Sequence, residues 1–129
     1  DEANPTAVSL FKALPKEDYD KLASSCDVGL IFLDYRFTIP NYPSRLLPYI
    51  MEHKPILAVT DPNCDTGLLA EENGYGYWCP SNSVECFVEV VNKMLNSDIK
   101  HMGDNGFNFF MNNYTTEHTY NTIVKHCKL

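Results

Sequence analysis

Short apolar stretches recur along the chain at the lengths expected of β-strands. Val28–Leu33 and Ile56–Val59 are nearly continuous apolar runs, which is the pattern of strands buried on both faces of a parallel sheet. Ala7–Leu14 alternates loosely between apolar and polar residues and predicts a further short strand. Tyr75–Trp78 predicts a last strand, which we expect at an edge of the sheet.

Helical patterns separate these strands. Pro15 stands where a first helical residue is expected, and Asn82 with Glu85 has the spacing of a capping box at the start of a later helix. Further helices are predicted at Thr66–Glu72, which Asn73-Gly74 closes, at Asp98–Asn113 and at Thr115–His126. The apolar faces of the helices are carried by Tyr19, Leu22, Ala23 and Cys26, then by Leu46, Leu47, Ile50 and Met51, then by Val84, Phe87, Val88, Val91, Met94 and Leu95, and last by Tyr120, Ile123 and Val124. We expect the stripe from Val84 to Leu95 to lie in the core.

The alternation of strands and helices predicts the α/β fold class. The expected architecture is an open parallel sheet flanked by helices, with right-handed crossovers. At 129 residues the chain is long enough for a single domain with its own core, so residues 1–129 are taken as that domain. The polar segment Asp1–Thr6 is interpreted as a severed loop of a longer protein.

The stretch from Asn41 to Thr60 combines a loop, a short helix and a strand. We expect the helix to begin at about Ser44 or Arg45 and to end at Lys54-Pro55, so that Pro48 lies in its first turn. A Ser-Arg pair at a helix start offers free backbone N–H groups and a fixed cation, which together suit a phosphate or diphosphate. The alternative is an ordinary helix–strand unit in which Ser44 only caps the helix.

These residues resemble those of a known enzyme family. The motif Tyr42-Pro43-Ser44-Arg45-Leu46-Leu47, followed by Tyr49 and by Lys54-Pro55-Ile56-Leu57-Ala58, is similar to the donor-binding half of retaining glycosyltransferase family 4, in its bacterial polysaccharide branch. Cys26–Ile31 resembles the strand before that motif, and Met102–Gly106 and Asn113–Tyr120 resemble the C-terminal helices of the family. The likeness covers residues 8–127, and it is the order and spacing of the pieces that make it specific.

The resemblance implies a partial, Rossmann-like C-terminal domain of the GT-B type. It implies binding of a nucleoside diphosphate sugar, expected to be a UDP-sugar, through Tyr42, Ser44, Arg45 and Leu46, with the nucleobase near Leu14 and Pro15. It also implies bacterial surface polysaccharide synthesis without a metal or another cofactor. A glycan or lipid-linked acceptor would be bound through an N-terminal domain, and the parent protein is expected to associate peripherally with membranes. This chain alone is expected to be inactive, and to self-associate through a sheet edge left bare by missing strands.

The sequence departs from the family at two positions. Family members carry two glutamates eight positions apart, and these positions fall on Pro40 and Pro48 here. Proline cannot accept a hydrogen bond through its side chain, so the ribose would have to be bound by other groups. The prolines also favour an alternative function, a non-catalytic nucleotide-binding or protein-interaction domain. No catalytic residue is assigned.

Composition and charge narrow the possible partners, the cellular compartment and the roles of individual charged residues. The net charge of −7 argues against nucleic acid as a partner. The five cysteines contain no C-x-x-C pair and are interpreted as reduced thiols of a cytoplasmic protein. Arg36 is interpreted as a solvated surface residue, and Asp61 and Asp65 as turn and cap residues. The scattered histidines suggest no catalytic triad.

Overall fold

The computed structural model describes residues 7–37, 39 and 41–127. The segment Asp1–Thr6 and Pro40, both used in the sequence argument, lie outside the described residues. The described chain forms a parallel sheet of three strands, β1 (Gly29–Phe32), β2 (Ile56–Thr60) and β3 (Gly76–Pro80), in the order β1-β2-β3. Gly29 is aligned with Ile56, and Ile56 with Gly76. The predicted α/β class and open parallel sheet are confirmed.

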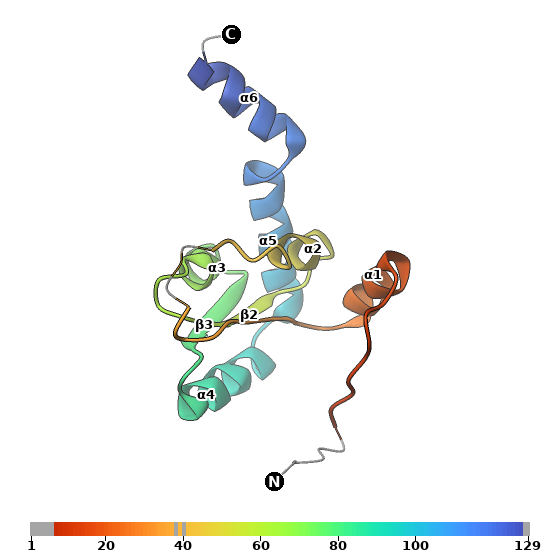
Figure 1. Ribbon diagram of the computed structural model, residues 1–129, viewed down its shortest axis with the longest axis vertical. Helices are drawn as coiled ribbons and strands as arrows, with labels where there is room; N and C mark the ends of the chain where they lie inside the picture. Colours follow the sequence, from red (N-terminus) through yellow and green to blue (C-terminus); the bar gives the residue numbers. More distant parts are fainter. Residues whose placement is uncertain (1–6, 38, 40, 128–129) are drawn as a thin grey trace.

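Six helices accompany this sheet in the described part of the chain, and α1 and α6 stand apart from the strands (Figure 1). They are α1 (Lys16–Ser25), α2 (Leu46–Met51), α3 (Thr66–Glu72), α4 (Val84–Leu95), α5 (Ile99–Asn113) and α6 (Thr116–Cys127). Ile56 and Ala58 pack with residues of α2 and α3 on one face of the sheet, and Leu57 and Val59 pack with Met94 of α4 on the other. Helix α6 extends away from the sheet and buries none of its described residues. None of the helices in the described residues is both long and apolar enough to cross a membrane.

The central part of the sheet agrees closely with the sequence prediction. Every residue of β2 is buried, and α3 has the predicted bounds. Asn73 caps the C-terminus of α3, and Gly74 follows it with φ +67°. Glycine adopts this left-handed conformation without the steric cost that a side chain imposes.

Two predictions about strands are wrong. Residues 7–14 form no strand and are exposed, with Leu10 at 98% exposure, because no described strand lies beside them to pair with their backbone. Val28–Leu33 was predicted to be buried on both faces, yet β1 is an edge strand in which Leu30 and Phe32 are exposed. An apolar run indicates that its residues are suited to burial. They are buried only where another helix or strand packs against them.

Three predictions about helices are also corrected. The stripe from Val84 to Leu95 is only partly core, because Val84, Val88 and Leu95 are exposed and Met94 is the buried residue of α4. The cap of α4 is Ser83, whose hydroxyl accepts a hydrogen bond from the Cys86 N–H, and not Asn82. In α1, only Ala23 is buried, and Pro15 is the capping residue before the first helical position.

Helix α5 crosses very close to the turn that follows α2. A Cβ atom at Gly103 would collide with the backbone carbonyl of His53. His53 has φ +54°, its ring stacks on Phe107 with centroids 4.2 Å apart, and its Nδ1 lies 2.8 Å from Oδ1 of Asp104. The crossing therefore depends on a residue without a side chain at position 103.

We predict that Gly103→Ala lowers the free energy of unfolding by about 1–3 kcal/mol, the usual cost of overpacking, as measured by urea denaturation. Asn112→Ala is the control, because Asn112 is exposed on the same helix and its replacement should change stability little. Equal stability of the two variants would show that α5 lies farther from the turn.

Candidate functional site

The loop before α2 lies at the carboxyl ends of the strands, where open parallel sheets bind ligands. Pro43 is buried, and its carbonyl accepts a hydrogen bond from the Leu46 N–H at 3.0 Å. Helix α2 begins at Leu46, one or two residues after the predicted start at Ser44 or Arg45, and Pro48 is its third residue. It ends at Met51, before the predicted stop at Lys54-Pro55. Pro48 therefore lies in the first turn, as predicted, where a missing N–H costs little.

The local geometry corrects part of the predicted phosphate seat. The Leu46 N–H is already bonded to Pro43, so it is not one of the free donors expected at this point. Helix α2 has six residues, so its dipole contributes little. Ser44 does not cap the helix, because Arg45 is the N-cap residue and makes no side-chain capping bond. The Arg45 side chain is thus the main positive charge of the site.

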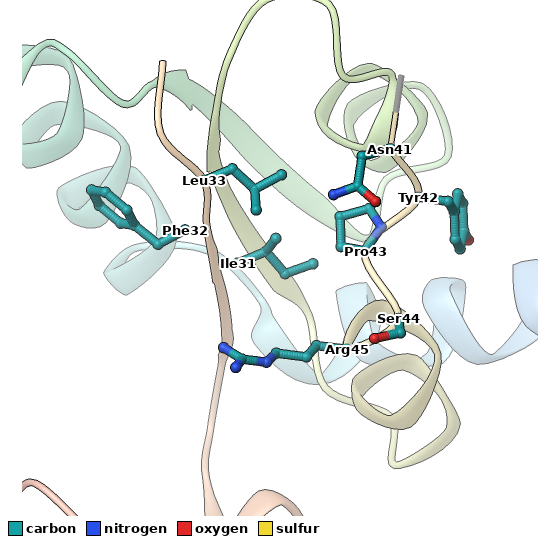
Figure 2. A pocket seen from close by; sticks show the side chains of 8 residues that line it. All are labelled: Ile31, Phe32, Leu33, Asn41, Tyr42, Pro43, Ser44 and Arg45. Atoms are coloured by element: carbon teal, nitrogen blue, oxygen red, sulfur yellow. The ribbon is translucent and has the colours of Figure 1, made fainter. Parts of the chain in front are cut away.

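Arg45 lies between two surface hollows. In Figure 2 its side chain extends from the start of α2 toward β1, below Ile31. The first hollow has a volume of about 470 Å³ and is lined by Ile31, Phe32, Leu33 and residues Asn41 to Arg45. The second has a volume of about 440 Å³ and is lined by Tyr19, Ser44, Arg45, Pro48 and Tyr49. Ser44 and Arg45 line both hollows, and both are exposed.

The two arginines of this region differ in their charge partners. The Arg36 guanidinium donates hydrogen bonds to both carboxylate oxygens of Asp34, at 2.9 and 2.7 Å. These bonds hold the pKa of the Asp34 carboxyl well below its usual range. None of the ion pairs within the described residues involves Arg45. Arg36 is the solvated surface residue predicted from the sequence. The charge of Arg45 has no such partner among the described residues and can attract an anion from solution.

Among the described residues, no Asp or Glu side chain lines either hollow. Asp61 is buried, and its Oδ1 accepts hydrogen bonds from the N–H groups of Asn63 and Cys64, which confirms its role in a turn. Asp65 is the N-cap residue of α3 but makes no side-chain capping bond. Among the described residues, no three His, Cys, Asp or Glu side chains are placed to hold a metal ion. The surroundings of Arg45 are therefore locally cationic in an acidic chain.

An aromatic chain holds the loop against the rest of the domain. The Tyr42 ring lies 5.5 Å from Tyr114, Tyr114 lies 5.6 Å from Phe109, and Phe109 lies 5.1 Å from Tyr75. Burial is the main cause that raises the pKa of Tyr42 above its ordinary value. In Figure 2 the Tyr42 ring points away from Arg45. Tyr42 thus positions the loop that carries Ser44 and Arg45.

The other predicted contacts are placed as follows. The Leu46 side chain is fully buried in the core. Leu14 and Pro15 precede α1 and line neither hollow, and the Pro15 carbonyl accepts hydrogen bonds from the N–H groups of Asp18 and Tyr19. Binding of a ligand by Leu46, Leu14 or Pro15 stays a prediction.

Tyr19 and Tyr49 were not anticipated as site residues. They lie on α1 and α2, which pack against each other beside Arg45. Burial, together with the neighbouring Tyr19, raises the pKa of Tyr49 to about 12, against the opposing effect of the Arg45 charge. Both tyrosines belong to predicted helices, but sequence spacing says nothing about which two helices meet.

Comparison with known proteins yields one informative similarity. The chain is 25% identical, over 105 residues, to a protein of Pseudomonas aeruginosa described as a probable glycosyltransferase, WbjE. The matched region is 81% of this chain and 26% of that protein, so the chain spans about a quarter of the length of its relative. No family model matches the chain, and no solved structure matches it significantly.

We predict that Tyr114→Ala loosens the Tyr42 loop, because it removes the ring on which Tyr42 packs. The amides of Ser44 and Leu46 should exchange with deuterium faster relative to amides of α4, and stability should fall by about 1–3 kcal/mol. Tyr114→Phe keeps the ring and should behave like the original chain. Unchanged exchange at Ser44 and Leu46 in Tyr114→Ala would mean that the loop is held elsewhere.

Proposed function

We propose that this chain is the donor-binding part of a retaining glycosyltransferase that uses a nucleoside diphosphate sugar, with UDP as the nucleotide. The observation that carries the proposal is the placement of Arg45. It is exposed, its side chain extends toward β1 (Figure 2), it lies between two hollows, and it forms no ion pair with the described residues. A diphosphate flanked by two bulky groups suits this arrangement of one cation and two hollows.

In the proposed reaction, the bond between the anomeric carbon of the sugar and the β-phosphate oxygen breaks, and the oxygen of an acceptor hydroxyl bonds to that carbon with retained configuration. The proton of the acceptor hydroxyl passes to the departing phosphate oxygen. Negative charge develops on the departing nucleoside diphosphate. The Arg45 guanidinium would neutralise this charge, and the Ser44 hydroxyl would donate a hydrogen bond to a phosphate oxygen. Stabilising developing charge with fixed groups is the largest contribution a protein usually makes to such a reaction.

The second hollow is the proposed place of the nucleoside. Pro48 lines it, and the resemblance to family 4 assigns ribose binding to this position. Because no carboxylate lines the hollow in the described residues, the phenol hydroxyls of Tyr19 and Tyr49 are the proposed partners of the ribose hydroxyls. The sugar would then occupy the first hollow, where Asn41 and Ser44 supply polar groups.

The remaining functional assignments concern a longer protein. The similarity to a probable glycosyltransferase about four times the length of the matched region supports a parent protein with a separate acceptor domain. We propose that this parent acts in the cytoplasm, takes part in bacterial surface polysaccharide synthesis, and meets a glycan or lipid-linked acceptor at the membrane surface. This chain would bind the donor without turning it over.

The second candidate function is a non-catalytic nucleotide-binding or protein-interaction domain. Proline at position 48 and the absence of carboxylates from both described hollows favour it. The two candidates differ in the ligand, because only the first requires the sugar of a UDP-sugar to contribute to binding. A titration that compares UDP with UDP-sugars therefore distinguishes them.

We predict that Arg45→Ala weakens UDP binding about 10- to 150-fold, which corresponds to 1.5–3 kcal/mol for a charge-assisted hydrogen bond. The measurement is a titration of the chain with UDP followed by amide chemical shifts. Arg36→Ala is the matched control, since Arg36 is neutralised by Asp34, and it should bind UDP like the original chain. Equal affinity of the Arg45→Ala and original chains would assign Arg45 to the solvent.

We also predict that Pro48→Glu is tolerated by the fold, because position 48 lies in the first turn of α2 and is only half-buried. The new carboxylate should strengthen binding of UDP through its ribose and leave binding of inorganic pyrophosphate unimproved. A folded Pro48→Glu chain that binds UDP no better would place the ribose away from the second hollow.

A further inference from the structure

Two of the cysteines lie together where β3 joins α4. Cys79 is the fourth residue of β3, and Cys86 lies in the first turn of α4. Both belong to the core beneath α4, where Cys79 is fully buried and Cys86 packs half-buried against the cluster that contains it. In Figure 1 the chain passes from the end of β3 directly into α4. Both residues are free thiols in this structure.

The connection between the two cysteines is held at both ends. Cys79 is aligned with Val59 in the sheet, and both residues belong to the core on the face that α4 covers. The Ser81 N–H donates a hydrogen bond to a carbonyl of β2 at 3.1 Å, which keeps the start of the connection on the sheet. The Ser83 hydroxyl accepts a hydrogen bond from the Cys86 N–H at 3.2 Å, which fixes Cys86 at the third position of the helix.

A contact farther along α4 shows how this helix crosses β3. The Nζ atom of Lys93 lies 4.0 Å from the centroid of the Tyr77 ring. Tyr77 and Cys79 are two residues apart on a strand, so their side chains point to one face. Lys93 and Cys86 are two helical turns apart, so they share one side of α4. Because the chain reverses direction between β3 and α4, the end of the strand lies under the start of the helix. Cys79 therefore faces Cys86.

The two thiols are in contact but are not equivalent. Burial, followed by the neighbouring Cys86, raises the pKa of the Cys79 thiol to about 11. Part of the effect of Cys86 is a hydrogen bond between the two side chains. A hydrogen bond raises the pKa of a thiol when that thiol is the donor, so the Cys79 S–H points to the Cys86 sulfur. At neutral pH Cys79 keeps its proton and places a donor beside the sulfur of the more exposed residue.

We propose that Cys79 and Cys86 are a redox-modification site, in which the two thiols form a reversible disulfide on reaction with hydrogen peroxide. Cys86 reacts first, because it is the partly exposed member of the pair and the Cys79 S–H stabilises negative charge on its sulfur. The Cys86 thiolate attacks one peroxide oxygen, the O–O bond breaks, and Cys86 sulfenic acid and hydroxide are formed.

The second step closes the disulfide. The Cys79 sulfur bonds to the Cys86 sulfur and displaces the sulfenic hydroxyl, which leaves as water with the Cys79 proton. The proton that Cys86 lost earlier neutralises the hydroxide of the first step. Two thiols are thus oxidised by two electrons, and one hydrogen peroxide is reduced to two waters. A thiol in solution reverses the change by attacking the disulfide.

The other described cysteines do not share this arrangement. The Cys64 thiol donates to the Thr66 hydroxyl at 3.3 Å, and the Cys26 thiol donates to a backbone carbonyl of its own helix at 3.2 Å. Cys26 and Cys127 are exposed. A transient disulfide is also the kind that occurs in a reducing compartment, where disulfides are usually redox-sensing rather than structural. The pair therefore agrees with the cytoplasmic location proposed above.

The test uses the 129-residue chain with Cys26→Ser and Cys127→Ser, which removes the two exposed cysteines and so prevents links between chains. Circular dichroism should show the fold unchanged by these two surface substitutions. The chain is treated with an equimolar amount of hydrogen peroxide, and the thiols that remain are alkylated. No sugar nucleotide is needed, so the result is independent of the function proposed above.

Digestion after glutamate then reads out the pair. Glu85 lies between the two cysteines, so Cys79 and Cys86 fall on separate peptides, 73–85 and 86–89, with no other cysteine on either. We expect these two peptides to be joined, with a mass two hydrogens below the sum of the reduced peptides, and to separate after treatment with dithiothreitol. The peptide that carries Cys64 is the internal control and should be alkylated as in the untreated chain.

Two variants test the order of the steps. In Cys79→Ala, Cys86 should stop at the sulfenic acid and be labelled by dimedone. In Cys86→Ser, Cys79 should stay reduced at the same peroxide concentration. Recovery of the two peptides unlinked after peroxide treatment of the chain that keeps both cysteines would overturn the proposal. A link from either cysteine to Cys64 instead, or dimedone labelling of Cys79 in place of Cys86, would overturn it as well.

Discussion

Burial of β2 on both faces is the constraint on which the rest of the molecule depends. All five of its residues are at most 5% exposed. This is possible only because α2, α3 and α5 lie on one face of the sheet while α4 lies on the other. The same burial requires strands on both sides of β2 to satisfy its backbone groups, which places β1 and β3. Once β1 is placed, the loop that follows it has to pass over the carboxyl ends of the strands. The loop that carries Arg45 is thus anchored at its start by the pairing of β1 with β2.

The sequence predicted those elements whose partners are determined nearby. The apolar run at Ile56–Val59, the helix Thr66–Glu72 and the turn at Gly74 all agree with the structure, because strand, helix and turn signals follow one another within a short stretch. The failures concern residues that could be covered but are not. Leu10, Phe32 and Val84 have the pattern of buried positions, yet each is exposed, since hydrophobicity says nothing about whether a neighbour is present.

The candidate site shows the same difference between features set by nearby residues and features that depend on distant ones. Ser44 and Arg45 could be identified because both stand in one contiguous motif, and the structure places both on the lining of the two hollows. Tyr19 could not be identified, because it reaches the site through the packing of α1 against α2. The positive charge around Arg45 could not be predicted either, because the negative net charge of a sequence does not show where its acidic side chains lie. Asp34 is engaged with Arg36, and Asp61 with the turn after β2.

The chain of rings from Tyr42 through Tyr114 and Phe109 to Tyr75 has a thermodynamic consequence. Tyr114 ends α5 and precedes α6, so the order of the ligand loop and the docking of α5 share the same contacts. By reciprocity, whatever ligand favours the ordered loop must favour the docked helix by an equal free energy. Occupancy at Arg45 would therefore stabilise the packing of α5 against the domain as well as the loop itself.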